Sequence, residues 1–306
     1  MAIAIFFTGL SAQAQLICGR DQLDCEGHSD RNTSAPAFPS SNTSVHLNPS
    51  AVPTDDTFGV ETIYFKNSFD FALVKGLGRV GAAVSPSNNE ETFFGVPAFE
   101  SAADFLTRMQ NGDKYQSQKV TLATGFSILD NRQSGLSRFH LEIGVIGKFN
   151  RADSHVLPGA GVSVILGPVT FGYATSLDEF ITDSTSIPPS QTVGFSTETF
   201  SAGIYLSSFA IDYSLLKIYA PGLDDYNITL ITGSLFLKRW IFTAANRRED
   251  SARMAYDFSS RSLVSERIKY NFFGGVQFAI TKHLMIDAFY DYYLLDDFSI
   301  GATLFF

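Results

Sequence analysis

The chain has 306 residues, of which 45% are apolar and only 17% are charged, and its formal net charge is −9. The charged fraction lies below the ~25% of an ordinary soluble domain. The negative net charge argues against nucleic-acid binding, which requires clustered Lys and Arg. No segment approaches the ~20 consecutive apolar residues that a membrane-spanning helix needs. The apolar residues are therefore spread along the chain, as in a sheet with one apolar face.

Residues 1–14 predict a secretory signal peptide. An apolar run from Ala2 to Leu10 precedes Ala12-Gln13-Ala14, which is a small-x-small cleavage pattern. We expect cleavage after Ala14. A buried N-terminal strand is the alternative explanation of the apolar run.

A polar arm follows, over residues 15–56. It is rich in Ser, Asn, Thr, Pro and Asp and lacks hydrophobic periodicity, so by itself it would not build a core. The chain has two cysteines, Cys18 and Cys25, and both lie in this arm. In an exported protein we expect them to form a disulfide. Metal binding by the two thiols and lipidation of Cys18 are the alternatives.

From residue 57 to the end, short alternating segments are separated by turn residues, which predicts an all-β domain of antiparallel strands. In the last segment, every second residue from Phe298 to Phe306 is apolar. Fourteen segments fit this pattern: 58–66, 68–75, 79–85, 117–129, 138–149, 159–166, 168–177, 194–206, 208–218, 226–237, 240–248, 264–280, 283–292 and 297–306.

The two faces of these segments predict a transmembrane antiparallel β-barrel. One face is broadly apolar, whereas the other mixes charges with small residues, which suits a lumen. A charge on the lipid face would cost ~2–4 kcal/mol at mid-bilayer. Glu198 falls on the apolar face of its segment, so we place it above the bilayer. The polar side chains expected in the lumen are Glu61, Arg79, Lys119, His140, Glu142, Lys148, Asp212, Arg267, Lys269, Asp287 and Asp291.

Short and long connections alternate between the predicted strands, as in bacterial outer-membrane barrels. An even number of strands would put both termini on the short-turn side, in the periplasm. The pattern Ser299-x-Gly301-x-x-Leu304-x-Phe306 resembles the assembly signal of such barrels. It implies that the barrel-assembly machinery is a partner during biogenesis. An ordinary strand that ends in Phe is the alternative.

The segment Leu47-Asn48-Pro49-Ser50-Ala51 precedes the first predicted strand. It resembles the Asn-Pro-Ala element at that place in the FadL/TodX family of transporters for hydrophobic compounds, with Ser50 where the family usually has Ala. The resemblance implies that residues 15–56 form a hatch inside the lumen, with Asn48, Pro49, Ser50 and Ala51 as the hatch motif. It also implies passive transport of a hydrophobic molecule such as a long-chain fatty acid. A plain turn is the alternative for Asn48-Pro49.

The longest predicted loop, residues 86–116, contains a segment with helical spacing of its apolar residues. We consider this loop a candidate ligand-binding site, and mutual packing of loops is the alternative. Its candidate ligand-binding residues are Phe93, Phe94, Phe99, Phe105, Leu106 and Met109.

Outer-membrane phospholipases and proteases build sites from Ser, His and Asp on barrel strands, and His140 with Glu142 is the one pair here that resembles part of such a site, but both lie on one inward face among other charges. The sequence has neither a Gly-x-Ser-x-Gly elbow nor a phosphate-binding loop, and its five histidines lack metal-ligand spacing. We therefore expect no catalysis, no metal and no cofactor. The expected partners are the lipid bilayer and a hydrophobic small molecule. A structural barrel that serves as a scaffold for surface or secretion partners and a general diffusion porin are the alternative functions.

Overall fold

The computed structural model describes most of the chain between Asn48 and Phe305. The described residues are 48–52, 54, 58–65, 68–87, 119–131, 137–150, 155–182, 191–206, 208–219, 226–249, 253–257, 262–266, 271–281, 283–291 and 297–305. The predicted signal peptide, the cysteines and the candidate ligand-binding loop lie outside these residues.

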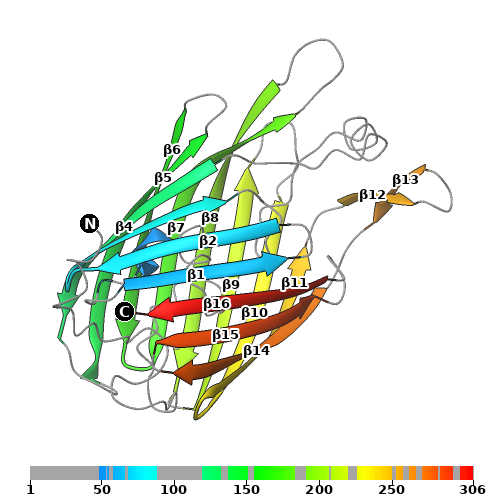
Figure 1. Cartoon of the computed structure of the whole chain (residues 1–306). Helices are drawn as coiled ribbons and strands as arrows, with labels where there is room; N and C mark the ends of the chain where they lie inside the picture. The colour runs from blue at the N-terminus through cyan, green and yellow to red at the C-terminus, as the bar shows by residue number, and fades with distance from the viewer. Residues whose placement is uncertain are drawn as a thin grey trace, which may run out of the picture.

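Fourteen antiparallel strands form one closed barrel, as the alternation predicted (Figure 1). The barrel strands are β1 (Phe58–Phe65), β2 (Ser68–Gly76), β3 (Val80–Ser87), β4 (Lys119–Asp130), β5 (Phe139–Asn150), β6 (Val156–Leu166), β7 (Val169–Thr182), β8 (Gln191–Tyr205), β9 (Phe209–Tyr219), β10 (Tyr226–Leu237), β11 (Trp240–Glu249), β14 (Asn271–Thr281), β15 (Leu284–Asp291) and β16 (Asp297–Phe305). A 3-10 turn, η1 (Pro49–Ala51), precedes β1.

The barrel closes where the first strand pairs with the last. β1 and β16 are antiparallel, with a register that runs from Gly59↔Phe305 to Tyr64↔Ile300. Each other barrel strand pairs with its neighbours in chain order, except that β11 pairs with β14. Closure leaves no unpaired sheet edge at the ends of the wall, which is the condition for a sheet to cross a hydrocarbon layer.

Two kinds of connection distinguish the ends of the barrel. Tight turns join β2 to β3, β6 to β7, β8 to β9, β10 to β11 and β14 to β15, and we call this end the short-turn rim. Gly78 and Gly167 have positive φ angles of 92° and 58° in two of these turns, a conformation that glycine adopts without steric cost. The opposite end is the long-loop rim, where most connections are longer but residues 66–67 alone join β1 to β2. At the short-turn rim, the connection from β4 to β5 is the longest, with residues 131–138. β1 begins and β16 ends at the short-turn rim.

One predicted strand was wrong in extent. The segment 264–280 is not a single strand, because β13 (Ser262–Glu266) pairs with β12 (Arg253–Asp257) in a separate two-stranded sheet. The barrel strand begins only at Asn271. The small sheet projects beyond the long-loop rim in Figure 1. Alternation alone could not separate the two strands, since β13 and β14 share the same period.

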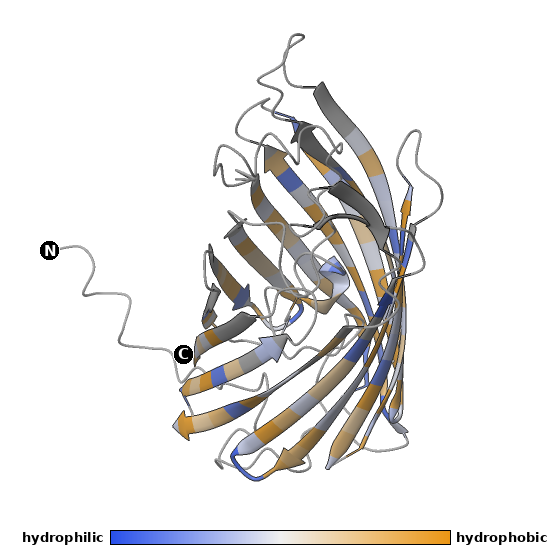
Figure 2. Cartoon of the chain, turned by 90° about the vertical axis from the view of Figure 1, so that its right-hand side faces the viewer, coloured by the Kyte–Doolittle hydropathy of each residue, from blue (hydrophilic) through white to orange (hydrophobic). Residues whose placement is uncertain are grey.

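The side chains of the wall alternate between a buried inward face and an exposed outward face. In β9, buried Ala210, Asp212 and Ser214 alternate with outward residues such as Ile211 and Tyr213, which are 51% and 45% exposed. Large apolar side chains are exposed in the same way around the wall, and Figure 2 shows the resulting apolar bands. A closed barrel with an apolar exterior and a polar interior is the arrangement that a bilayer requires, so we treat the chain as membrane-spanning.

Among the described residues, no helix is long and apolar enough to cross a membrane.

A charge placed on the outward face tests this arrangement. Ile231→Lys, on the outward face near the middle of β10, should destabilise the barrel in lipid by about 2–4 kcal/mol, because the ammonium would face hydrocarbon. The measurement is the urea unfolding free energy of the protein in vesicles. Leu77→Lys is the control, since Leu77 lies in a rim turn and is 67% exposed. Equal stability of the two variants would mean that the exterior faces water.

Candidate functional site

The turn η1 lies inside the barrel and is fully buried. Asn48 caps it, because its Oδ1 accepts hydrogen bonds from the Ser50 amide at 3.0 Å and from the Ser50 hydroxyl at 2.7 Å. Pro49 occupies the first position of the turn, where its fixed φ fits and its missing N–H costs nothing. The Ala51 amide donates to the Asn48 carbonyl at 3.0 Å. The turn Asn48–Ala51 is thus closed by hydrogen bonds between its own residues.

The wall beneath this turn is a row of three paired glycines, which we call the glycine row: Gly125, Gly144 and Gly161. They lie side by side on β4, β5 and β6, since Gly125 pairs with Gly144 and Gly144 pairs with Gly161. A Cβ atom at Gly144 would lie 2.2 Å from the Pro49 carbonyl carbon, and one at Gly161 would lie 2.1 Å from Asn48 Oδ1. The backbone of the turn therefore lies directly on the wall, where no side chain could fit. We call this contact between the turn and the glycine row the seat.

Residues 48–52 and Thr54 form what we call the seated segment, and polar contacts hold both of its ends against the wall. The hydroxyls of Ser50 and Ser163 are hydrogen-bonded to each other. Farther along, the Thr54 hydroxyl donates to Glu142 Oε1 at 3.4 Å, and the Gly78 amide donates to the Thr54 carbonyl at 2.8 Å. The segment thus runs along the inner wall from β6 to the turn between β2 and β3.

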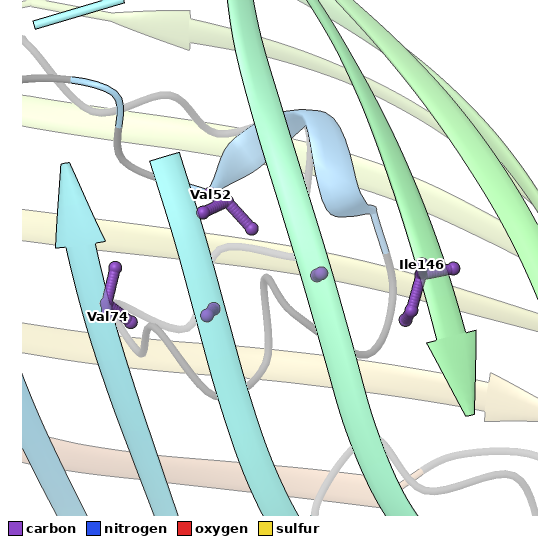
Figure 3. Close-up of a cluster of buried hydrophobic side chains, with 5 residues drawn as sticks. Val52, Val74 and Ile146 are labelled. Carbon is purple, nitrogen blue, oxygen red and sulfur yellow. The ribbon is translucent and has the colours of Figure 1, made fainter. Parts of the chain in front are cut away.

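An apolar contact lies between these polar ones. Val52 is fully buried and forms a cluster with Val74, Ala83, Ala123 and Ile146, which point inward from β2, β3, β4 and β5 (Figure 3). Full burial of a Val side chain contributes about 1.5–3 kcal/mol. The cluster therefore gives the segment a hydrophobic anchor next to the glycine row.

Charged groups on the inner wall are buried and paired near the seat. His140 Nε2 lies 3.3 Å from Glu142 Oε1, and the Ser127 hydroxyl lies 3.0 Å from the same nitrogen. A Ser-His-acid relay needs the serine and the carboxylate on opposite ring nitrogens, so these three residues do not form a catalytic triad. Among the described residues, no group of His, Cys, Asp and Glu has the geometry of a metal site.

Nearer the long-loop rim, Lys148 on β5 and Asp178 on β7 form a buried ion pair. The pair spans β6, which lies between the two strands. Lys148 on β5 is paired with Leu157 on β6, and Gly159 on β6 is paired with Ser176 on β7. It ties together two strands that are not adjacent. Breaking such a pair by removing one partner leaves an uncompensated buried charge.

The inner wall becomes apolar toward the long-loop rim on β8, β9 and β10. We call this region the lumenal apolar patch, and it consists of Phe195, Leu216, Ile218, Ile228 and Leu230, each at most 7% exposed. Leu216 is directly paired with Ile228. Below the patch the inward positions are polar, with Ser201, Ser214 and Thr232. Apolar side chains such as Phe236 and Ile241 are also buried near the short-turn rim, and Thr197 and Thr199 lie beside the patch on β8, so the patch is one apolar region of a mixed lumen.

The structure places only some of the residues predicted for the site on the inner wall. The hatch motif Asn48–Ala51 lies together inside the barrel, and Glu61, His140, Glu142, Lys148, Asp212 and Asp287 are buried on the inner wall. Arg79 is exposed in the turn after β2. Lys119 and Asp291 belong to β4 and β15, but their side chains lie outside the description. Outside the described residues lie Arg267, Lys269, Phe93, Phe94, Phe99, Phe105, Leu106, Met109, Cys18 and Cys25.

Sequence reasoning missed the glycine row, Ser163, Asp178, Val52 and Thr54. The glycines were visible only as small residues on the inward face of three separate segments. Their alignment depends on the strand register, which includes a β-bulge between Ser127 and Leu129. A search for glycines at inward positions of consecutive strands could have found them.

Comparisons with known proteins give a structural likeness only. No family model matches the sequence, and no curated protein matches it. Among solved structures, the chain is similar to a protein described as the CymD monoaromatic hydrocarbon channel, with 10% identity and a TM-score of 0.46 over 87% of this chain and 93% of that one. It is also similar to the NanC porin, with 8% identity and a TM-score of 0.41 over 81% and 98% of the chains. The outer-membrane protein OmpT of Vibrio cholerae matches with 9% identity and a TM-score of 0.38 over 82% and 96%.

A methyl group at the glycine row tests the seat. Gly144→Ala should expel the turn, because the new Cβ would overlap the Pro49 carbonyl. Hydrogen exchange of the amides of Ser50 and Ala51, followed by mass spectrometry, should become faster. Gly233→Ala is the control, since a Cβ there meets nothing within 4 Å. Unchanged exchange in Gly144→Ala, with the barrel still folded, would refute the seat.

Proposed function

We propose that the chain is a passive channel of the bacterial outer membrane for hydrophobic small molecules. The lumenal apolar patch is the observation that carries this proposal. A porin for polar solutes gains nothing from apolar side chains inside its lumen, because they raise the free energy of a water-filled path. A hydrophobic solute, in contrast, would exchange water for Leu216 and Ile228. A long-chain fatty acid is one molecule of this class.

We infer further that residues 15–56 act as a hatch. A fourteen-stranded barrel is too wide for its own side chains to fill, so a closed state needs an additional segment in the lumen. The seated residues Asn48–Val52 and Thr54 support this role, because they hold one end of the arm against the wall. Release of this segment would open a path from the apolar patch to the short-turn rim. In this proposal the short-turn rim faces the periplasm and holds both termini.

The wall between β2 and β3 supports a second route for a hydrophobic solute. Within the described residues, these strands are paired only from Leu73↔Val84 to Gly76↔Gly81, next to the short-turn rim. β4 and β5, in contrast, are paired along their whole length. Separation of the two strands toward the long-loop rim would let a hydrophobic solute pass from the lumen into the bilayer.

Transport by reconstituted protein tests the function. Vesicles that contain the protein should equilibrate a medium-chain fatty acid faster than protein-free vesicles. The rate of entry of a sugar of similar size should be the same in both kinds of vesicle. Leu216→Gln together with Ile228→Gln should slow fatty-acid entry severalfold, because both ends of the paired contact become polar. Ser214→Gln, on the same strand and face, is the matched control. Equal passage of the sugar would indicate a diffusion porin, and passage of neither solute would indicate a structural barrel.

Conductance tests the hatch separately. Deletion of Leu16–Ser50 should raise the ion conductance of single barrels in planar bilayers, because the lumen would lose its obstruction. The control is the full-length protein from the same preparation. Unchanged conductance would contradict the hatch while leaving the transport proposal intact.

A further inference from the structure

One row of inward residues crosses four strands near the short-turn rim. Thr170 on β7 is paired with Gly203 on β8. Gly203 is paired with Asp212 on β9, which in turn is paired with Thr232 on β10. We call these four residues the Asp212 row. Because β8 ends at Tyr205, the row lies close to the rim.

The polar side chains of the Asp212 row are buried on the inner wall. Thr170, Asp212 and Thr232 are only 3%, 2% and 1% exposed. Strand pairing brings the Cβ atoms of Asp212 and Thr232 within ~5.5 Å of each other. A carboxylate is costly to bury unless an opposite charge compensates it. The row therefore combines one buried acid with two buried hydroxyls.

The glycine of the row lets two of these polar groups approach one point above β8. A Cβ atom at Gly203 would lie 2.0 Å from Asp212 Oδ1 and 3.1 Å from Thr170 Oγ1. It would also lie 2.7 Å from Cε2 of Tyr205, whose ring therefore bounds this point. The carboxylate and the Thr170 hydroxyl thus converge where the wall has no side chain.

The two hydroxyls of the row are suited to hold a bound group. Among the described residues, neither Thr170 Oγ1 nor Thr232 Oγ1 has a hydrogen-bond partner. Burial of a hydroxyl without a partner is costly. In native proteins an ion or an ordered water molecule commonly satisfies such groups. Both oxygens can serve as neutral ligands beside the carboxylate.

We propose that the Asp212 row binds a monovalent metal cation, Na⁺. Asp212 supplies the negative charge, and the hydroxyl oxygens of Thr170 and Thr232 supply neutral ligands. The ion would neutralise one buried charge on the wall of the lumen. Its binding does not depend on which molecule the barrel transports.

Space and charge select this ion over other cations. An organic ammonium does not fit, because a single carbon atom above Gly203 would already lie 2.0 Å from Asp212 Oδ1. Carboxylate and hydroxyl groups are hard oxygen ligands, which Ca²⁺ takes at ~2.3–2.6 Å. Na⁺ has nearly the same radius as Ca²⁺. One carboxylate balances the charge of Na⁺, whereas Ca²⁺ would keep a net positive charge in a buried place.

Cation-dependent stability of the reconstituted barrel tests the site. Urea unfolding is measured in vesicles at one ionic strength, with N-methylglucamine chloride replaced stepwise by sodium, potassium or calcium chloride. An ion that binds only the folded barrel raises its stability as the ion concentration increases. Sodium should therefore raise the unfolding midpoint more than potassium or calcium.

Variants of the row should remove this dependence without unfolding the barrel. Asp212→Asn should abolish the effect of sodium. Thr170→Val and Thr232→Val should each weaken Na⁺ binding about tenfold, the size expected for the loss of one polar contact to a charge. In N-methylglucamine chloride the two valine variants should be at least as stable as the unchanged protein. A purely structural role of the hydroxyls would instead lower stability equally in both salts.

Thr199→Val is the matched control, because Thr199 is also buried and inward on β8 but is paired with Leu216 outside the row. It should keep the full effect of sodium. Heat-dependent gel mobility verifies that every variant is folded. Equal midpoints in sodium and N-methylglucamine chloride, a larger effect of potassium or calcium, or an unchanged effect of sodium in Asp212→Asn would overturn the proposal.

Discussion

The seat inside the barrel depends on the absence of side chains at one place in the wall. Gly125, Gly144 and Gly161 let the backbone of the Asn48–Ala51 turn contact the inner surface. The hydroxyl contact to Ser163 and the burial of Val52 require this approach, because both groups extend from the seated backbone. A single methyl group at the center of the row would separate all of these contacts at once.

The barrel itself could be predicted from the sequence, because the two-residue alternation along each strand is a local pattern. Alternation of apolar and polar residues needs only neighbors in the chain, and fourteen barrel strands were found from it. Inward burial of Glu142 and Asp212 followed from the same period. The segment 264–280 was wrong because two strands of equal period adjoin there, and only hydrogen-bonding partners distinguish β13 from β14.

The contact of the turn with the glycine row could not be predicted, because it depends on register between strands. Gly125 and Gly161 become neighbors of Gly144 only when turns and a bulge set the pairing of β4, β5 and β6. Glu198 was recognized as an acid on the apolar face, but its pairing with Lys217 was not. The motif Asn48-Pro49 was visible as a turn, whereas its place on the wall depends on contacts with residues about a hundred positions away.

The most direct measurement of the seat is a cross-link between the turn and the wall. Ser50→Cys and Ser163→Cys, combined with Cys18→Ser and Cys25→Ser, should form a disulfide under mild oxidation, since their hydroxyls are in contact and a disulfide tolerates only short Cα separations. Mass spectrometry of the digested protein identifies the linked peptides. We predict near-complete cross-linking in folded barrels, and none for Ser50→Cys with Ser214→Cys on β9. Equal, low cross-linking of both pairs would contradict the seating of the turn on the glycine row.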